Sequence, residues 1–286
     1  MLFVLISLFF ASSAFAAETP DKKGILLVSF GTSMPEATGA IEALTRATEE
    51  AFPDVPVRIA YTSNIIRRKL KREQNISIPT PAEALAALND EGFTHVAVQP
   101  MHIIPGEEYD EVKGVVDAFA SIQGKYGFQR LLIGRPFLSN AEDCAVMAGI
   151  LKRRFEGRTG KTVVLMGHGT PHMANAMYSE LQLAISRAAG EGKIVLGTVE
   201  AGPSFDDVLA TLKKARGKRL VLAPFMIVAG DHANNDLADP DDPESWLSRF
   251  KKEGYTVETD LVGLGQYPEI AKLFVNHVAE LLKQVR

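Results

Sequence analysis

The chain has 286 residues, of which 46% are hydrophobic and 23% charged, a composition typical of a globular protein with two domains. Its formal net charge of −4 argues against nucleic acid as a general partner. The single cysteine, Cys144, excludes an internal disulfide and any multi-cysteine metal or iron–sulfur site.

The N-terminus has the pattern of an export signal. Residues 2–11 form an uncharged apolar run that is too short to span a bilayer as a stable helix. Ala14 and Ala16 then form the A-x-A arrangement of a cleavage site. We therefore predict a signal peptide over residues 1–16, cleavage after Ala16, and a periplasmic mature protein with no stable membrane span. No Lys or Arg precedes the apolar run, and an uncleaved N-terminal anchor is the alternative.

Apolar segments alternate with helical patterns through the first half of the chain. The predicted strands cover 24–30, 57–62, 96–100 and 131–134. The predicted helices cover 34–52, 80–89, 109–120 and 141–154. The helix at 80–89 has the clearest start signal, because Thr80 and Glu83 form a capping box with Pro81 at the first helical position.

The second half repeats this order of elements. Its predicted strands cover 162–166, 194–198, 219–223 and 258–263. Its predicted helices cover 174–189, 204–215, 243–252 and 268–284. Strands that alternate with helices of this length are typical of parallel sheets covered on both faces. The sequence therefore predicts an α/β protein with two doubly wound parallel-sheet lobes, over 22–140 and 141–286, related by internal duplication.

Two pairs of segments support the duplication. GILLVSFGTSMPEA at 24–37 aligns with KTVVLMGHGTPHMA at 161–174. VAVQPMHIIPGEE at 96–108 aligns with LVLAPFMIVAGDH at 220–232. The duplication accounts for the scaffold, and positions where the copies differ in chemistry need a functional reason.

Three pairs of matched positions differ in this way. They are Phe30 and His168, Ser63 and Glu200, and Glu108 and His232. His168, Glu200 and His232 each follow a predicted strand, at the sheet edge where ligands bind in such folds. A lone histidine is more often structural, but two imidazoles and a carboxylate at matched strand ends favour a site for Co, Fe, Ni or Zn. Three protein ligands would leave coordination positions free.

Other residues at predicted strand ends are candidates for binding a ligand. His102 follows the third strand, where it would contact a ligand or satisfy local backbone groups, and Met226 is its counterpart. Phe30 and Ser33 lie in the first Gly-Thr turn, whose glycine permits close approach of a large flat ligand. Arg135 follows the fourth strand, and its planar guanidinium suits a carboxylate.

The two Gly-Thr turns lack the motifs of nucleotide-binding loops. Neither Gly-Thr turn matches GxGxxG or GxxxxGK[ST], so we predict no nucleotide.

The run RRKLKR at 67–72 is the most basic segment of the chain. It is either a solvated helix face or a surface that attracts a polyanionic ligand.

At these residues the sequence resembles the sirohydrochlorin cobaltochelatases of the anaerobic cobalamin pathway, which are ATP-independent class II chelatases. The matching segments are LLVSFGTS (26–33), QPMHIIPGEEYDEV (99–112), LMGHGTPHMAN (165–175), GTVEAGPS (197–204) and APFMIVAGDHANNDLA (223–238). The resemblance extends from about residue 22 to the C-terminus. It implies that two lobes enclose a tetrapyrrole and that the metal ligands are His168, Glu200 and His232. Most of the family is cytoplasmic, so the predicted export is a departure.

The resemblance also implies a reaction. Co2+, with Fe2+ as a second metal, would replace the two inner N–H protons of sirohydrochlorin without ATP. His168 and His232 would hold the metal and accept the protons, with Glu200 balancing charge. The alternative is an exported metal- or tetrapyrrole-binding protein on the same scaffold, which export and two clamping lobes favour. A homo-oligomer is compatible with the sequence, which decides neither oligomeric state nor the choice among Co, Fe and Ni.

Overall fold

The computed structural model describes residues 21–215 and 217–285, and the predicted signal peptide lies outside these ranges. Eight strands within them form two four-stranded parallel sheets. The first sheet, in the order β2-β1-β3-β4, contains β1 (Lys23–Ser29), β2 (Val57–Tyr61), β3 (His95–Pro100) and β4 (Arg130–Ile133). The second sheet, in the order β6-β5-β7-β8, contains β5 (Thr162–Gly167), β6 (Ile194–Thr198), β7 (Arg219–Pro224) and β8 (Thr256–Thr259).

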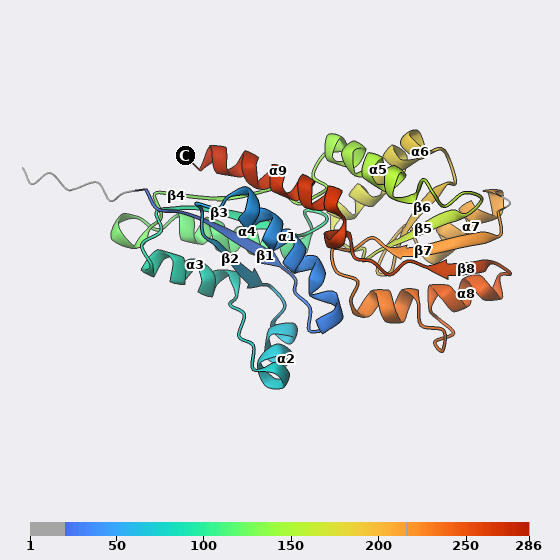
Figure 1. The fold of residues 1–286 in the computed structure, drawn as a ribbon, viewed down its shortest axis with the longest axis horizontal. Helices are drawn as coiled ribbons and strands as arrows, with labels where there is room; N and C mark the ends of the chain where they lie inside the picture. The colour runs from blue at the N-terminus through green and yellow to red at the C-terminus, as the bar shows by residue number, and fades with distance from the viewer. Residues whose placement is uncertain (1–20, 216, 286) are drawn as a thin grey trace, which may run out of the picture.

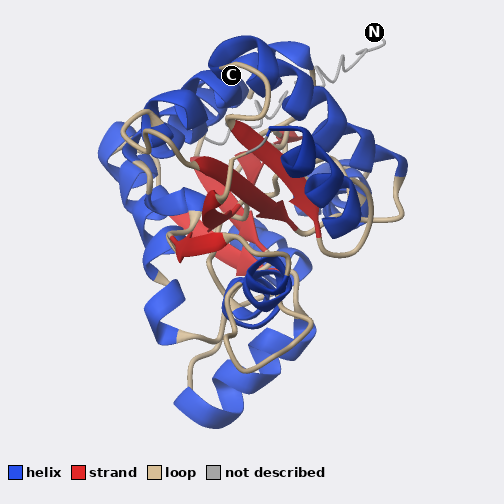
Figure 2. Cartoon of the chain, turned by 90° about the vertical axis from the view of Figure 1, so that its right-hand side faces the viewer, coloured by secondary structure: helices blue, strands red, loops and turns tan. Residues whose placement is uncertain are grey.

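Helices cover both sheets. The α-helices are α1 (Gly39–Ala51), α2 (Asn64–Gln74), α3 (Pro81–Asp90), α4 (Glu107–Ala120), α5 (Ala141–Phe155), α6 (Ala176–Ala189), α7 (Phe205–Ala215), α8 (Trp246–Lys252) and α9 (Pro268–Gln284). Shorter helical turns are η1 (Pro35–Ala37), η2 (Gly124–Tyr126), η3 (Met173–Asn175), η4 (Ala233–Leu237) and η5 (Leu264–Gln266). Figure 2 shows strands enclosed by helices, which is why the central strands β3 and β5 are buried along their whole length.

The predicted α/β fold and its duplication are confirmed in detail. Besides the equal strand orders, equivalent backbone hydrogen bonds recur in both lobes. Ser63 N–H donates to the Phe30 carbonyl over 3.3 Å, as Glu200 N–H donates to the His168 carbonyl over 2.8 Å. The Phe137 and Leu264 amides donate in the same way to the carbonyls of His102 and Met226. The residues paired in the sequence therefore occupy equivalent places in the fold.

Most elements lie close to their predicted positions, with local differences. The predicted helix at 34–52 is divided into η1, with Pro35 at its start, and α1. The capping box before α3 is present, with Thr80 N–H donating to the Glu83 carboxylate over 2.7 Å. Strand β8 ends before the predicted 263, because the chain turns into η5 through Gly263, where a Cβ would lie 2.6 Å from the Ile227 carbonyl oxygen.

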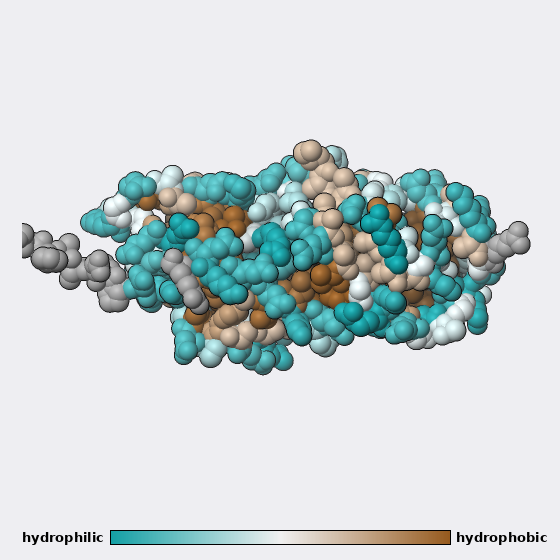
Figure 3. All heavy atoms as spheres, turned by 90° about the horizontal axis from the view of Figure 1, so that it is seen from above, coloured by the Kyte–Doolittle hydropathy of each residue, from teal (hydrophilic) through white to brown (hydrophobic). Residues whose placement is uncertain are grey.

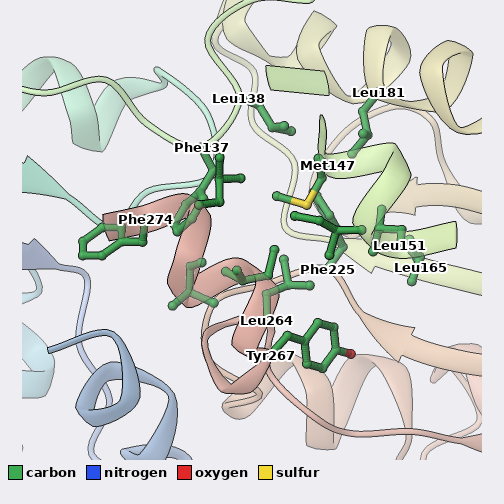
Figure 4. Close-up of a cluster of buried hydrophobic side chains, with 14 of the residues drawn as sticks. Phe137, Leu138, Met147, Leu151, Leu165, Leu181, Phe225, Leu264, Tyr267 and Phe274 are labelled. Atoms are coloured by element: carbon green, nitrogen blue, oxygen red, sulfur yellow. The ribbon is translucent and has the colours of Figure 1, made fainter. Parts of the chain in front are cut away.

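The lobes share one apolar seam. Helix α5 packs on α6 of the second lobe, whereas α9, the last helix, returns to pack on α1, β3 and β4 of the first. The last helix of the predicted C-terminal lobe thus packs against the N-terminal sheet. Between these helices, Phe137 of the connecting segment stacks on Phe274 of α9 at 5.6 Å between ring centroids. Figure 4 shows this cluster continuing to Phe225, Met147 and other residues of the second lobe.

The helices α5, α6 and α9 lie along one side of the molecule (Figure 1), and that face is mainly hydrophilic with separate hydrophobic patches (Figure 3). Among the described helices, none combines the length and apolar character needed to cross a membrane.

On the first sheet, α3 and α4 cover the face opposite α1 and α9. The carboxyl ends of the strands in the two sheets point toward each other (Figure 1), so residues that follow the strands lie between the lobes.

Candidate functional site

Two histidines of the second lobe lie side by side. His168 follows β5 directly, and His232 precedes η4 in the segment after β7. Their ring centroids are 4.7 Å apart, and the ring planes are nearly perpendicular, at 86°. His168 is exposed and His232 is half-exposed. The two imidazoles predicted from the sequence to act together are therefore neighbours at the carboxyl edge of the sheet.

Each ring has a hydrogen-bond partner at Nδ1. His168 Nδ1 lies 2.8 Å from the Gly169 carbonyl oxygen, and His232 Nδ1 lies 2.7 Å from Asp236 Oδ2. Since both partners are acceptors, each neutral ring carries its proton on Nδ1 and has a lone pair on Nε2. Neither Nε2 has a partner among the described residues. The site therefore presents two ring nitrogens suited to bind a metal ion or accept a proton.

Asp236 is a site residue that the sequence analysis missed. It lies one turn after His232 in η4, which has the wide hydrogen-bonding pattern of a π-helix. Such turns are rare and often occur at functional sites. The available signal was the spacing of four residues between a histidine and a carboxylate, since side chains at that spacing meet on one helix face. A carboxylate behind a histidine fixes the ring's orientation and tautomer.

The turn that carries His168 is held by its own backbone. Gly169 has a φ of 82°, and a Cβ there would lie 2.9 Å from the Ala201 amide nitrogen, so only glycine fits. The buried Tyr178 hydroxyl lies near the backbone of His168 and Gly169, and burial raises the pKa of Tyr178 to about 12. The hydroxyl therefore stays neutral and supports the turn.

Glu200 adjoins the pair through its backbone. Its N–H donates to the His168 carbonyl, while its side chain is exposed. Over residues 21–215 and 217–285, no three His, Cys, Asp or Glu side chains are grouped in a way that would hold a metal ion. The structure thus brings two of the three predicted ligands together, and Glu200 as the third ligand stays a prediction.

The facing edge of the first lobe carries polar groups that lack partners. Both ring nitrogens of His102 and Oε2 of Glu108 are buried without a hydrogen-bond partner in the described part of the chain. Burial lowers the pKa of His102 to about 4, which keeps the ring neutral. Buried polar atoms are normally paired, so this edge is suited to a ligand with hydrogen-bonding groups.

The remaining predicted substrate contacts have different surroundings. Phe30 follows β1 with 49% of its surface exposed, as a flat apolar side chain at the same edge. Ser33 is half-buried, and its carbonyl accepts a hydrogen bond from Gln74 of α2. Arg135 is engaged by two carboxylates, Asp143 of α5 and Glu280 of α9, at the seam between the lobes. Arg135 therefore ties helices together, which the sequence did not indicate.

The basic run at 67–72 is also partly structural. Arg67 donates to the Ile78 carbonyl over 2.7 Å and pairs with Glu83 over 2.6 Å. Arg68 and Lys69 are exposed on α2, the helix that projects from the lower side of the first lobe in Figure 1. Lys71 and Arg72 are exposed too, but they contact Asn75 and Glu73, so Arg68 and Lys69 are the exposed cations of the run without a side-chain partner among the described residues.

The chain is similar to known proteins along nearly its whole length. Residues 23–283 match the family model described as cobalt chelatase (CbiK). The chain is 36% identical to a sirohydrochlorin cobaltochelatase of Salmonella typhimurium, over 91% of this chain and 97% of that protein. It is 34% identical to sirohydrochlorin cobaltochelatase CbiKC of Nitratidesulfovibrio vulgaris, over 90% and 89%. The fold resembles that of SirB from Bacillus subtilis, solved with Fe3+, with a TM-score of 0.58 at 18% identity over 91% and 95% of the two chains.

Asp236→Asn should weaken the metal site, because the amide cannot balance charge on the His232 ring and does not select the Nδ1–H tautomer. We expect Co2+ affinity, measured by calorimetry, to fall about 10- to 100-fold. Asp231→Asn is the matched control, since Asp231 is an exposed neighbour whose carboxylate accepts from Asn235 instead of a histidine. Equal affinities in both variants would remove Asp236 from the site.

His102→Phe should flatten the acid dependence of stability. The folded pKa of His102, about 4, lies below the ordinary histidine value near 6.5, so only the unfolded chain takes up this proton as pH falls between them. In the wild type, stability is therefore lost as pH drops through 6.5 toward 4, by up to about 3 kcal/mol from this residue. Urea denaturation at pH 7 and pH 5 checks this. An equal loss of stability in both proteins would show that His102 is not buried in neutral form.

Proposed function

The chain belongs to the cobalt chelatase (CbiK) family, and on this premise we propose that it inserts Co2+ into sirohydrochlorin without a nucleotide. The observation that carries the proposal is the pair formed by His168 and His232, with Nδ1 of each ring occupied and Nε2 free. The family match supports the metal and the reaction. The names of two relatives support the macrocycle.

The reaction needs a metal donor and a proton acceptor. One Co2+ replaces two N–H protons, so the macrocycle binds the metal through its nitrogens and two protons leave. An imidazole Nε2 lone pair can hold the metal first and take a proton once the metal has moved to the macrocycle. Asp236 and the Gly169 carbonyl would keep both rings oriented through these steps, since they bind the opposite nitrogen.

We assign Glu200 to the same site as the third metal ligand. Its backbone is fixed to the His168 carbonyl, and its side chain is free to turn. A carboxylate would offset the charge of a divalent ion and supply the oxygen donor of a mixed nitrogen and oxygen site. Fe2+ suits the same set of ligands, so we include it as a second metal that the enzyme would accept.

The first lobe would bind the macrocycle. The exposed ring of Phe30 offers a flat apolar surface, and the unpaired atoms of His102 and Glu108 offer hydrogen-bonding groups. Ser33 lies in the same turn as Phe30. For the carboxylates of the substrate we favour the exposed cations of α2 over Arg135, whose guanidinium already contacts two carboxylates.

An exported binding protein on the same scaffold is the alternative. Stoichiometry distinguishes the chelatase from the binding protein: an enzyme converts many equivalents of sirohydrochlorin with Co2+, whereas a binding protein stops at one equivalent per site. Absorbance spectra of the macrocycle at substrate excess give this ratio directly.

His168→Ala and His232→Ala should each lose most turnover and keep sirohydrochlorin binding, because these rings act on the metal and the protons. We expect kcat to fall by at least about 100-fold, with little change in the dissociation constant of the metal-free macrocycle. Calorimetry with Co2+ separates the two roles, since a variant with intact metal affinity and no turnover has lost a proton acceptor. Near wild-type insertion rates in both variants would refute the assignment.

We propose in addition that the protein is exported to the periplasm. The apolar run at 2–11 and the Ala14-x-Ala16 pattern support this. The mature protein isolated from its host should begin at Ala17, and N-terminal sequencing of the periplasmic fraction checks this. Recovery of soluble cytoplasmic protein that retains Met1 would contradict export.

A further inference from the structure

The loop after His168 reaches the opposite lobe. His172 Nε2 lies 3.4 Å from Asp110 Oδ2 of α4. Next to this contact, a Cβ placed on Gly106 would lie 3.9 Å from Thr170 Cγ2, so the Thr170 side chain also approaches the Gly106 backbone. His172 and Asp110 therefore connect the carboxyl edges of the two sheets across the space where the macrocycle would bind.

The His172 ring is oriented for this contact. Its Nδ1 accepts a hydrogen bond from the Ala174 N–H over 3.1 Å, so the neutral ring carries its proton on Nε2, the atom that faces Asp110. The Nε2–H of neutral His172 can therefore donate to the Asp110 carboxylate, so the contact does not require protonation of the ring. The His172 side chain is 30% exposed and that of Asp110 is 59% exposed, so water reaches the contact and the pair can separate.

The loop transmits this contact to the metal-binding residues. Thr170 N–H donates to the Asn175 side chain, and the Asn175 amide donates to the Gly202 carbonyl, two residues after Glu200. His172 N–H in turn donates to the Thr170 hydroxyl. A displacement of His172 would therefore shift the turn of His168 and the segment of Glu200 together.

The two sides of the molecule differ in how the lobes are joined. On the side of α5 and α9 the lobes share a continuous apolar core around Phe137 and Phe274. Helix α4 lies on the opposite face of the first sheet, and there the exposed polar pair of His172 and Asp110 joins the lobes. A polar, solvated contact separates at much lower cost than a packed core.

We infer that His172 and Asp110 are positioning residues that form a clasp between the lobes, which closes over the bound macrocycle and sets the His168 turn against it. This inference rests on the proposed function and adds to it the residues that retain the substrate. The clasp opens to admit sirohydrochlorin and to release the product, while the apolar seam stays intact.

The test is the dissociation rate of sirohydrochlorin from the full-length protein without Co2+, measured by stopped-flow displacement. Asp110→Asn should raise this rate about two- to five-fold, the range expected for an exposed charged contact. Asp117→Asn is the matched control, because Asp117 is also 59% exposed on α4 but pairs with Lys113 inside its own lobe. It should leave the rate unchanged.

Variants that reverse the charges at positions 172 and 110 distinguish loss of this contact from a general loss of stability. His172→Glu keeps an acceptor for the Ala174 amide and puts a second carboxylate opposite Asp110, so dissociation should accelerate further. Adding Asp110→Lys should restore a rate near that of the wild type. Additive effects in the double variant, or an Asp110→Asn rate equal to that of the wild type, would overturn the clasp. A wild type that binds no sirohydrochlorin would instead overturn the proposed function.

Discussion

The hydrogen bonds at Nδ1 of His168 and His232 determine what this site can do, because they assign the proton to one nitrogen of each ring and leave the other free. A backbone carbonyl holds the first ring and a carboxylate holds the second. The rings stay 4.7 Å apart because one follows β5 and the other begins a π-helical turn after the adjacent β7. Loss of either partner would free a ring to rotate or change tautomer.

Duplication provides the frame in which this pair arises. Both lobes use the same strand order and the same backbone bonds at the strand ends, so a side chain at one of these positions automatically lies between the sheets. The two lobes then present different functional groups at these positions. The second presents imidazoles, and the first presents an exposed phenyl ring and buried groups without partners, such as those of His102. In the proposed function, the second lobe would hold the metal and the first would bind the macrocycle opposite it.

The sequence predicted what depends on local pattern. Alternating strands and helices, the capping box at Thr80 and the matched positions of the two copies all follow from short-range spacing, and the structure confirms them. The sequence could not predict contacts between residues that lie far apart in the chain and meet only in the folded protein. Arg135 looked free for a substrate, yet one of its carboxylates comes from α9, 145 residues later. Asp236 was missed because a π-helical turn has no simple apolar period, and the return of α9 to the first sheet has no local signal.

X-ray absorption spectroscopy of the Co2+-loaded protein shows directly whether the two imidazoles bind the metal together. Binding by both rings should give cobalt–nitrogen distances of about 2.1 Å and the outer-shell scattering of two imidazole rings. His232→Ala should remove one ring from that signal while the other remains. A cobalt ion surrounded by oxygen alone, or a spectrum that is unchanged when both histidines are replaced, would contradict it.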